Sequence, residues 1–343
     1  MIWIYIIIIV LLAAVEMAYF RIADRFNIID KPDECSSHST NVLRGGGIIF
    51  PLSMFLWATV MLLQGNDISS YVPFLIGLSL IAVVSISDDI HSLSNSIRLV
   101  AQFIGVTLMF WSVILMNNGE VIVHSQGWML IAFGIIALIV CVGATNIINF
   151  MDGINGITAG YALAVLIPLL LLNRDLSFIE DSYLLVSVLV FSFFNFRPKG
   201  KEKIFAGDVG SIGIAFIMLF AICLLMLSTK DITWLVFLIV YGIDGCQTIL
   251  HRIILHEPLG RAHHKHVYQL MANELGMNHV VVSLIYMGLQ LVISLVMEYV
   301  IPNTVLAHWV YLITAALMLT VAYVVFMKKY YYLHDNYLSS LNE

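Results

Sequence analysis

The chain has 343 residues, of which 61% are hydrophobic and only 11% are charged. Soluble domains carry about 25% charged residues, so this sequence has too few polar side chains to cover a water-exposed surface. A soluble enzyme is excluded, and the composition indicates an all-α polytopic integral membrane protein. The net charge of −6, with no basic face or binding motif, gives no indication of a nucleic-acid partner.

Apolar runs long enough to cross about 30 Å of hydrocarbon predict ten to eleven transmembrane helices in a single integral domain, residues 1–343. The short runs among them borrow flanking residues, are tilted, or are core helices. In chain order the predicted spans lie at residues 2–20, 46–64, 72–87, 99–116, 128–147, 157–172, 183–196, 209–228, 233–250, 280–297 and 304–327.

The distribution of Lys and Arg predicts an N-terminus outside, because basic residues concentrate in short cytoplasmic loops. With eleven spans in that orientation, only Arg174 and Lys230 of the 16 Lys and Arg residues lie outside. The first span has no basic stretch before it and no small-residue cleavage site after it, so it is not predicted to be a removable signal peptide.

Carboxylates flank two of the apolar runs on the inner side. Asp88 and Asp89 come directly after the run 72–87, and Asp208 lies between two glycines before another span. Adjacent carboxylates repel, so the pair needs a cation or a donor, although alone it is better explained as a solvated helix end. Asp208 is as consistent with a helix cap as with a ligand for a hard cation such as Mg²⁺.

Residues 146–156 contain a third polar set. On a continuing helix Asn146 and Asn149 share one face, and Asp152 extends the same row. Gly153 and Gly156 then allow a turn or a close approach to a ligand. A row of three oxygen-bearing side chains is more than a turn requires, so we favour a functional role over a simple helix boundary.

The last inner segment gathers histidines and basic residues. Zinc is not favoured, because no Cys or carboxylate stands at ligand spacing, and an anion such as phosphate fits the set better. Arg252 alone is also explained as a contact to anionic lipid headgroups. The set consists of Arg252, Arg261, His263, His264, Lys265 and His266.

An acidic, oxygen-rich set and a basic set on one membrane face are what phosphoryl transfer needs. Carboxylates bind Mg²⁺, and cations stabilise the charge that develops on the phosphoryl group. The sequence has neither a Walker A motif nor G-x-G-x-x-G, so no standard nucleotide-binding fold supplies the phosphate site.

In their order and residue pattern these motifs resemble those of the polyprenyl-phosphate N-acetylhexosamine-1-phosphate transferases, the group of MraY, WecA and WbpL. The resemblance covers nearly the whole chain. The late histidine stretch is closest to the WbpL/WecA-like branch. The matching stretches are D-x-P, S-S-H-S and R-G-G-G in residues 30–47, D-D at 88–89, N-x-x-N-x-x-D-G-x-x-G at 146–156, F-x-G-D-x-G-S at 205–211, D-x-x-x-T-x-x-x-R at 244–252 and H-x-x-H-x-Y-Q at 263–269.

The resemblance implies that undecaprenyl phosphate attacks the β-phosphate of a UDP-N-acetyl sugar and releases UMP, which would initiate O-antigen or another cell-envelope polysaccharide. UDP-GlcNAc is the conservative expectation for the sugar, and the histidine stretch also favours 6-deoxy relatives such as UDP-FucNAc or UDP-QuiNAc. It implies Mg²⁺, or Mn²⁺ as an alternative, and a bacterial inner membrane with the active site on the cytoplasmic face. Membrane lipid and a second copy of the chain, as a homodimer, are candidate partners.

Roles carried over by resemblance fall into three groups. Asp208 and Asn149 are expected to bind the metal, and Asp88, Asp89 and Asp152 to form the catalytic acidic set. The expected substrate contacts are Arg44, Asn195, Arg252, His263, His264 and His266.

Three stretches depart from the family pattern and put the choice of sugar in doubt more than the chemistry. They are Cys35, residues 41–43 and the charged residues 199–203. The main rival function is an ion-coupled transporter, because carboxylates near membrane helices often mark ion paths. Transport sites lie near the bilayer midplane between repeats, however, and no repeat is visible here. An inactive scaffold is a third hypothesis, although the acidic motifs look intact.

Overall fold

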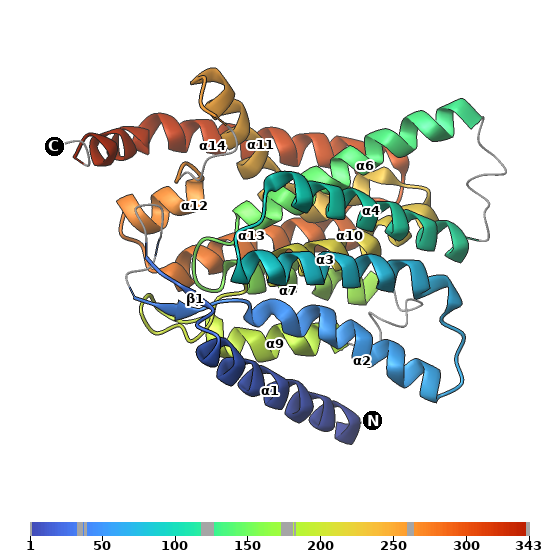
Figure 1. The fold of residues 1–343 in the computed structure, drawn as a ribbon. Helices are drawn as coiled ribbons and strands as arrows, with labels where there is room; N and C mark the ends of the chain where they lie inside the picture. Colours follow the sequence, from blue (N-terminus) through green and yellow to red (C-terminus); the bar gives the residue numbers. More distant parts are fainter. Residues whose placement is uncertain are drawn as a thin grey trace.

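The computed structural model describes residues 2–32, 37, 40–117, 127–172, 181, 183–258 and 264–340. These residues form a bundle of helices that run roughly alongside one another (Figure 1). The helices are α1 (Ile2–Arg25), α2 (Ile49–Leu63), α3 (Val72–Ile90), α4 (Asn95–Met116), α6 (Gly127–Phe150), α7 (Ile157–Leu172), α9 (Tyr183–Asn195), α10 (Gly207–Thr229), α11 (Ile239–Ile254), α12 (Val267–Gln269), α13 (His279–Tyr299) and α14 (Val305–Ser340).

Every apolar run predicted as a span is helical, which confirms the all-α polytopic prediction. Nine helices of the described chain are long and apolar enough to cross a membrane. The remaining two, α7 with 16 residues and α9 with 13, are shorter apolar helices. The exact number of crossings and the side of the N-terminus stay predictions.

Helix α10 forms the centre of the bundle. Within its most apolar window, 89% of the residues are buried, against 17% for α14 and 22% for α6. The helix packs against α2, α3, α6 and α7. The ring of Phe74 on α3 stacks on Phe216 and Phe220 of α10. The outer helices therefore keep apolar faces for lipid, whereas α10 carries its first turn into the protein interior.

Several helices extend beyond the predicted apolar runs and take the motif residues with them. Helix α3 continues through Asp88 and Asp89, and α6 continues through Asn149 to Phe150. The predicted row is wrong for Asp152, because α6 ends before it and the chain turns. The Asn146 amide also points elsewhere, since its Nδ2 donates to Gln102 Oε1 on α4 at 2.6 Å.

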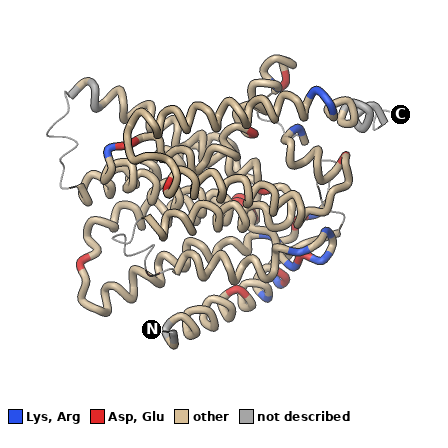
Figure 2. The backbone as a smooth tube through the Cα atoms, turned by 180° about the vertical axis from the view of Figure 1, so that it is seen from behind, with Lys and Arg blue, Asp and Glu red and all other residues tan. Residues whose placement is uncertain are grey.

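A short antiparallel hairpin lies at one end of the bundle. Its strands are β1 (Ile29–Asp30) and β2 (Val42–Leu43). The hairpin is joined to the connection between α9 and α10, since the Phe205 N–H donates to the Leu43 carbonyl at 2.8 Å. Figure 2 shows most of the Lys and Arg positions gathered at this same end. The sorting of basic residues to one side, predicted from the sequence, is therefore present in the fold.

Candidate active site

The connection after β2 and the start of α10 pack backbone against backbone. The N–H groups of Gly46 and Gly47 donate to the carbonyls of Phe205 at 2.9 Å and Ala206 at 3.0 Å. A Cβ added to Gly210 would lie only 2.6 Å from the Gly47 Cα, so no larger residue fits without movement. This close approach brings Arg44 next to the first turn of α10.

Asp89 organises that first turn. Its side chain is 0% exposed, and its two oxygens accept the N–H groups of Asp208 at 2.8 Å and Val209 at 3.1 Å. The Arg44 Nε lies 2.7 Å from Asp89 Oδ1. A carboxylate at the N-terminus of a helix satisfies N–H groups that have no partner within the helix. Asp89 therefore fixes Asp208 and Arg44 in place.

Asp208 is the point where the cluster converges. Its Oδ1 accepts from Arg44 Nη2 at 3.0 Å and from Asn149 Nδ2 at 3.1 Å. Its Oδ2 lies 3.0 Å from Arg98 Nη2. Asp89 and Asp208 raise the pKa of Arg44 although burial opposes its charge, so the guanidinium stays charged. One carboxylate thus carries contacts from three separate parts of the chain.

Arg98 is a site residue that the sequence reasoning missed. Its guanidinium joins Asp208 to Asp88, whose Oδ2 lies 3.0 Å from Arg98 Nη1, and also reaches Asn149 Oδ1 at 3.4 Å. The Leu93 N–H donates to the second oxygen of Asp88 at 2.6 Å. The signal in the sequence was one basic residue in the first turn of the helix after the aspartate pair.

The oxygens around Arg98 fit a divalent metal. Asp88, Asp208 and Asn149 come from three helices and direct oxygens at one cationic group. Mg²⁺ and Mn²⁺ prefer oxygen ligands, and Mg²⁺ takes one or two carboxylates together with waters and phosphate oxygens. The described residues contain no group of three His, Cys, Asp or Glu suited to a metal. A metal bound here would use oxygens of Asp208, Asp88 and Asn149, and the binding of Mg²⁺ stays a prediction.

A polar cavity of about 220 Å³ lies beside this cluster. Asp152 lines it and accepts a hydrogen bond from Thr158 Oγ1 at 2.6 Å. Burial raises the pKa of Asp152 to about 6, although the Thr158 hydrogen bond opposes this. The other lining residues are Asp30, Ser37, Arg44, Asn149, Gly153, Ile154, Asn195, Phe205, Gly207, Asp208 and Gln269.

Asn195 joins two of the motif stretches at the cavity wall. Its Oδ1 accepts the Gly156 N–H at 2.8 Å, and its Nδ2 donates to the Ile204 carbonyl at 2.9 Å. These bonds show how the residue shapes the cavity, while its predicted contact with substrate stays a prediction. Asp30, Ser37 and Gln269 also line the cavity, and the sequence reasoning had assigned them no role.

The histidine segment, residues 255–269, reaches the cavity through Gln269. His266 is buried, and its Nδ1 lies 3.1 Å from Asp244 Oδ1. His264 and Arg252 are buried as well, and Arg252 Nη2 donates to the Pro258 carbonyl at 2.6 Å. None of these three is among the described residues that line the cavity, so their predicted contacts with substrate stay predictions. His263 falls outside the described residues.

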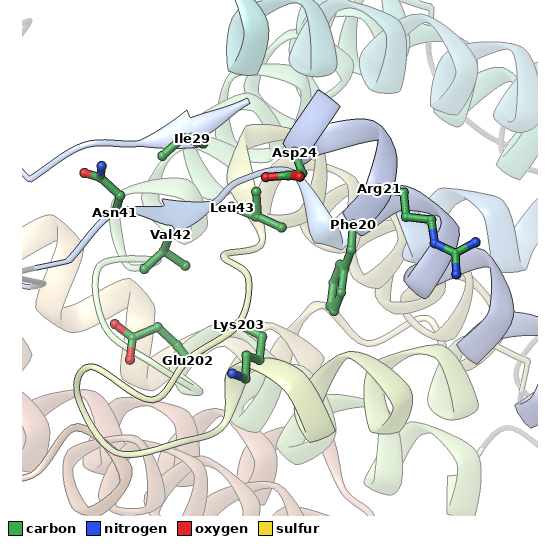
Figure 3. Close-up of a pocket in the computed structure, with 9 residues that line it drawn as sticks. All are labelled: Phe20, Arg21, Asp24, Ile29, Asn41, Val42, Leu43, Glu202 and Lys203. Carbon is green, nitrogen blue, oxygen red and sulfur yellow. The ribbon is translucent and has the colours of Figure 1, made fainter. Parts of the chain in front are cut away.

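A second, larger cleft of about 550 Å³ opens between α1, the hairpin and the connection to α10 (Figure 3). None of the described residues that line it is among those predicted for the site. Its lining mixes both signs of charge with apolar side chains. The residues are Phe20, Arg21, Asp24, Ile29, Asn41, Val42, Leu43, Glu202 and Lys203.

Comparison with known proteins places the chain in a family. Residues 71–243, just over half of the chain, match the model of glycosyl transferase family 4. The chain belongs to glycosyl transferase family 4. The matched region contains α3, α4, α6 and α10, and thus the carboxylates at the centre of the cluster. Arg44 and the histidine segment lie outside it.

Two relatives illustrate the range of similarity. A Bacillus subtilis (strain 168) protein named probable undecaprenyl-phosphate N-acetylglucosaminyl 1-phosphate transferase is 28% identical over 279 residues, covering 76% of this chain and 73% of the relative. A Thermotoga maritima phospho-N-acetylmuramoyl-pentapeptide-transferase is 29% identical over 186 residues, covering 50% of this chain and 57% of the relative. The first similarity extends well beyond the region that matches the family model.

Proposed function

We propose that this membrane protein transfers an N-acetylhexosamine-1-phosphate from a UDP-sugar to undecaprenyl phosphate. The observation that carries the proposal is the convergence of Asp88, Asp208 and Asn149 on one cationic group beside a polar cavity. The names of the Bacillus and Thermotoga relatives support a phospho-sugar transferase. UDP-GlcNAc is the first sugar to test because the Bacillus relative is named for an N-acetylglucosaminyl group.

In the proposed reaction an oxygen of the lipid phosphate attacks the β-phosphorus of the UDP-sugar. The bond from that phosphorus to the bridging oxygen breaks, and UMP leaves with the bridging oxygen. A phosphate monoester has a second pKa of about 6 and is largely ionised at neutral pH, so no strong base is needed. The problem for the enzyme is instead the repulsion between two anions.

Arg44 and Arg98 are the residues of this chain best placed to reduce that repulsion. Both guanidinium groups contact Asp208, and Arg44 lines the cavity. A bound Mg²⁺ would add a positive charge on the phosphates and orient them. Asp89 keeps the first turn of α10 in position, and we assign it this supporting role rather than contact with substrate.

We further propose that the active site faces the cytoplasm across a bacterial inner membrane. The support is that the hairpin beside the cavity lies at the end of the bundle where Lys and Arg gather (Figure 2). The lipid product would carry the first sugar of O-antigen or another cell-envelope polysaccharide.

The experiment that tests the function supplies purified protein with Mg²⁺, undecaprenyl phosphate and a panel of UDP-N-acetylhexosamines. UMP release is expected only when both substrates are present, with UDP-FucNAc and UDP-QuiNAc as the alternatives to UDP-GlcNAc. Absence of turnover with every sugar in the panel, from a protein that is folded, would overturn the proposal.

A further inference from the structure

The segment between α11 and α12 carries the predicted sugar-binding histidines, and its two described ends meet in an ion pair. Lys265 Nζ donates to Oε1 of Glu257, which lies eight residues earlier in the chain. The Lys265 side chain is 7% exposed and that of Glu257 is 30% exposed. A lysine buried to this extent is unusual unless it is paired.

Glu257 is in turn fixed to the end of α11. Its second oxygen, Oε2, lies 3.4 Å from Arg252 Nε. Arg252 also donates to the Pro258 carbonyl, so one guanidinium binds both the carboxylate and the neighbouring backbone. The basic residues Arg252 and Lys265 therefore share one acidic partner, which the sequence reasoning did not single out.

The third side of this cluster comes from α14. Lys265 Nζ lies 5.7 Å from the centre of the Tyr331 ring, within the range of a cation–π contact. One turn further along, His334 Nδ1 lies 2.8 Å from Glu274 Oε1, and both side chains are almost fully buried. With 36 residues, α14 is about 54 Å long and exceeds the thickness of the hydrocarbon core. Its far end is thus available to pack on the histidine segment.

Both members of the ion pair are charged near neutral pH. Burial raises the pKa of Glu257, but the Lys265 ammonium outweighs it and brings that pKa below its usual range. Burial lowers the pKa of Lys265, but Glu257 outweighs it and raises that pKa above its usual value. The contact is therefore a true ion pair rather than a neutral hydrogen bond.

We propose that Glu257, Lys265 and Tyr331 form a clasp that positions His264 and His266 for the sugar nucleotide. Lys265 is then a positioning residue, held between a carboxylate and an aromatic ring, and not itself a ligand of the diphosphate. His266 is fixed from the other side by Asp244. The inference rests on the proposed function for the identity of the ligand.

Two single variants separate the clasp from direct binding by the lysine. If the clasp positions the histidines, Glu257→Gln and Lys265→Gln each raise the KM for UDP-GlcNAc about tenfold and leave kcat within about twofold. Tenfold is the factor expected for the loss of one charge-assisted hydrogen bond. If Lys265 binds the diphosphate directly, Glu257→Gln releases the ammonium, and the KM stays unchanged or falls. That result would overturn the proposal.

Four further variants control for structural damage. The double variant Glu257→Lys/Lys265→Glu restores an ion pair with reversed charges and is expected to recover most of the KM. Tyr331→Leu is expected to raise the KM by about threefold, while Tyr331→Phe keeps the ring. Lys328→Gln changes an exposed lysine on α14 and should leave every parameter unchanged.

A readout without substrate makes the clasp testable on its own. Backbone hydrogen exchange of residues 264–268 is expected to rise about tenfold in both single variants and to return in the charge-reversed double variant. Raised exchange in a protein without any turnover would support the clasp and contradict the proposed function. Wild-type exchange and wild-type KM in Glu257→Gln would contradict the clasp and leave the function standing.

Discussion

The carboxylate cluster and the histidine segment lie in the same molecule but are built differently. Asp88, Asp89 and Asp208 are on helices that pack in or against the centre of the bundle, and each has described partners on another element. The histidine segment is a connection, and its described ends are fixed by Glu257 and by α14. This difference fits the proposed function if the residues on the helices carry out the chemistry and those of the connection select the substrate.

If the two regions have these separate roles, the largest effect on kcat comes from substitution of Asp208. We expect Asp208→Asn to lower kcat by about 10³-fold, because it removes charge from the residue on which Arg44, Arg98 and Asn149 converge. UMP release measures the effect. Asp67→Asn alters an exposed aspartate outside the cavity and is the matched control. Comparable rates for the two variants would remove Asp208 from the reaction centre.

Arg98 should come next. Arg98→Gln keeps hydrogen-bond donors but removes the charge shared by Asp88 and Asp208, and we expect kcat to fall by about 10²-fold. The KM for the UDP-sugar should change much less than in the clasp variants. A pure KM effect would place Arg98 with the binding residues and weaken the contrast between the two regions.

The close approach of α10 to the turn at Gly47 predicts a loss of stability. Gly210→Ala puts a Cβ 2.6 Å from the Gly47 Cα, and we expect the free energy of unfolding to fall by about 1–3 kcal/mol. The thermal midpoint in detergent measures this change. Gly134→Ala is the control, because an added Cβ there meets nothing within 4 Å. Equal midpoints for the two variants would show that the backbone contact is dispensable.

The smallest effect concerns Asp152 and pH. Its folded pKa of about 6 exceeds the unfolded value of about 3.9, so ionisation disfavours the folded protein. The contribution of Asp152 to the free energy of unfolding is fully present below about pH 4 and is lost as the pH rises through about 6. The thermal midpoint of wild type relative to Asp152→Asn should fall across that interval and level off above it. A constant difference between them would contradict the raised pKa.

The sequence predicted the helices and the carboxylates because both leave local patterns. Apolar runs of fixed length mark the spans, and Asp88, Asp89 and Asp208 stand where those runs end. The pairing of Arg98 with Asp208 could not be predicted in this way, because the two residues are 110 positions apart and meet only after helices α4 and α10 pack.

In the histidine segment the local sequence predicted the residues but not their partners. Its basic residues suggested an open anion site, yet Arg252 and Lys265 both pair with Glu257. Nothing in the local sequence distinguishes Glu257 from a solvated surface residue, and Tyr331 comes from a helix much later in the chain. A cluster assembled from three separate elements is visible only in the folded chain.

The most direct test of the central claim is UMP release by the purified protein in the presence of Mg²⁺. We expect release when undecaprenyl phosphate and a UDP-N-acetylhexosamine are supplied together, no release when either is omitted, and release about 10³-fold slower when Asp208 is replaced by Asn. Release without the lipid phosphate, or undiminished release from Asp208→Asn, would contradict it.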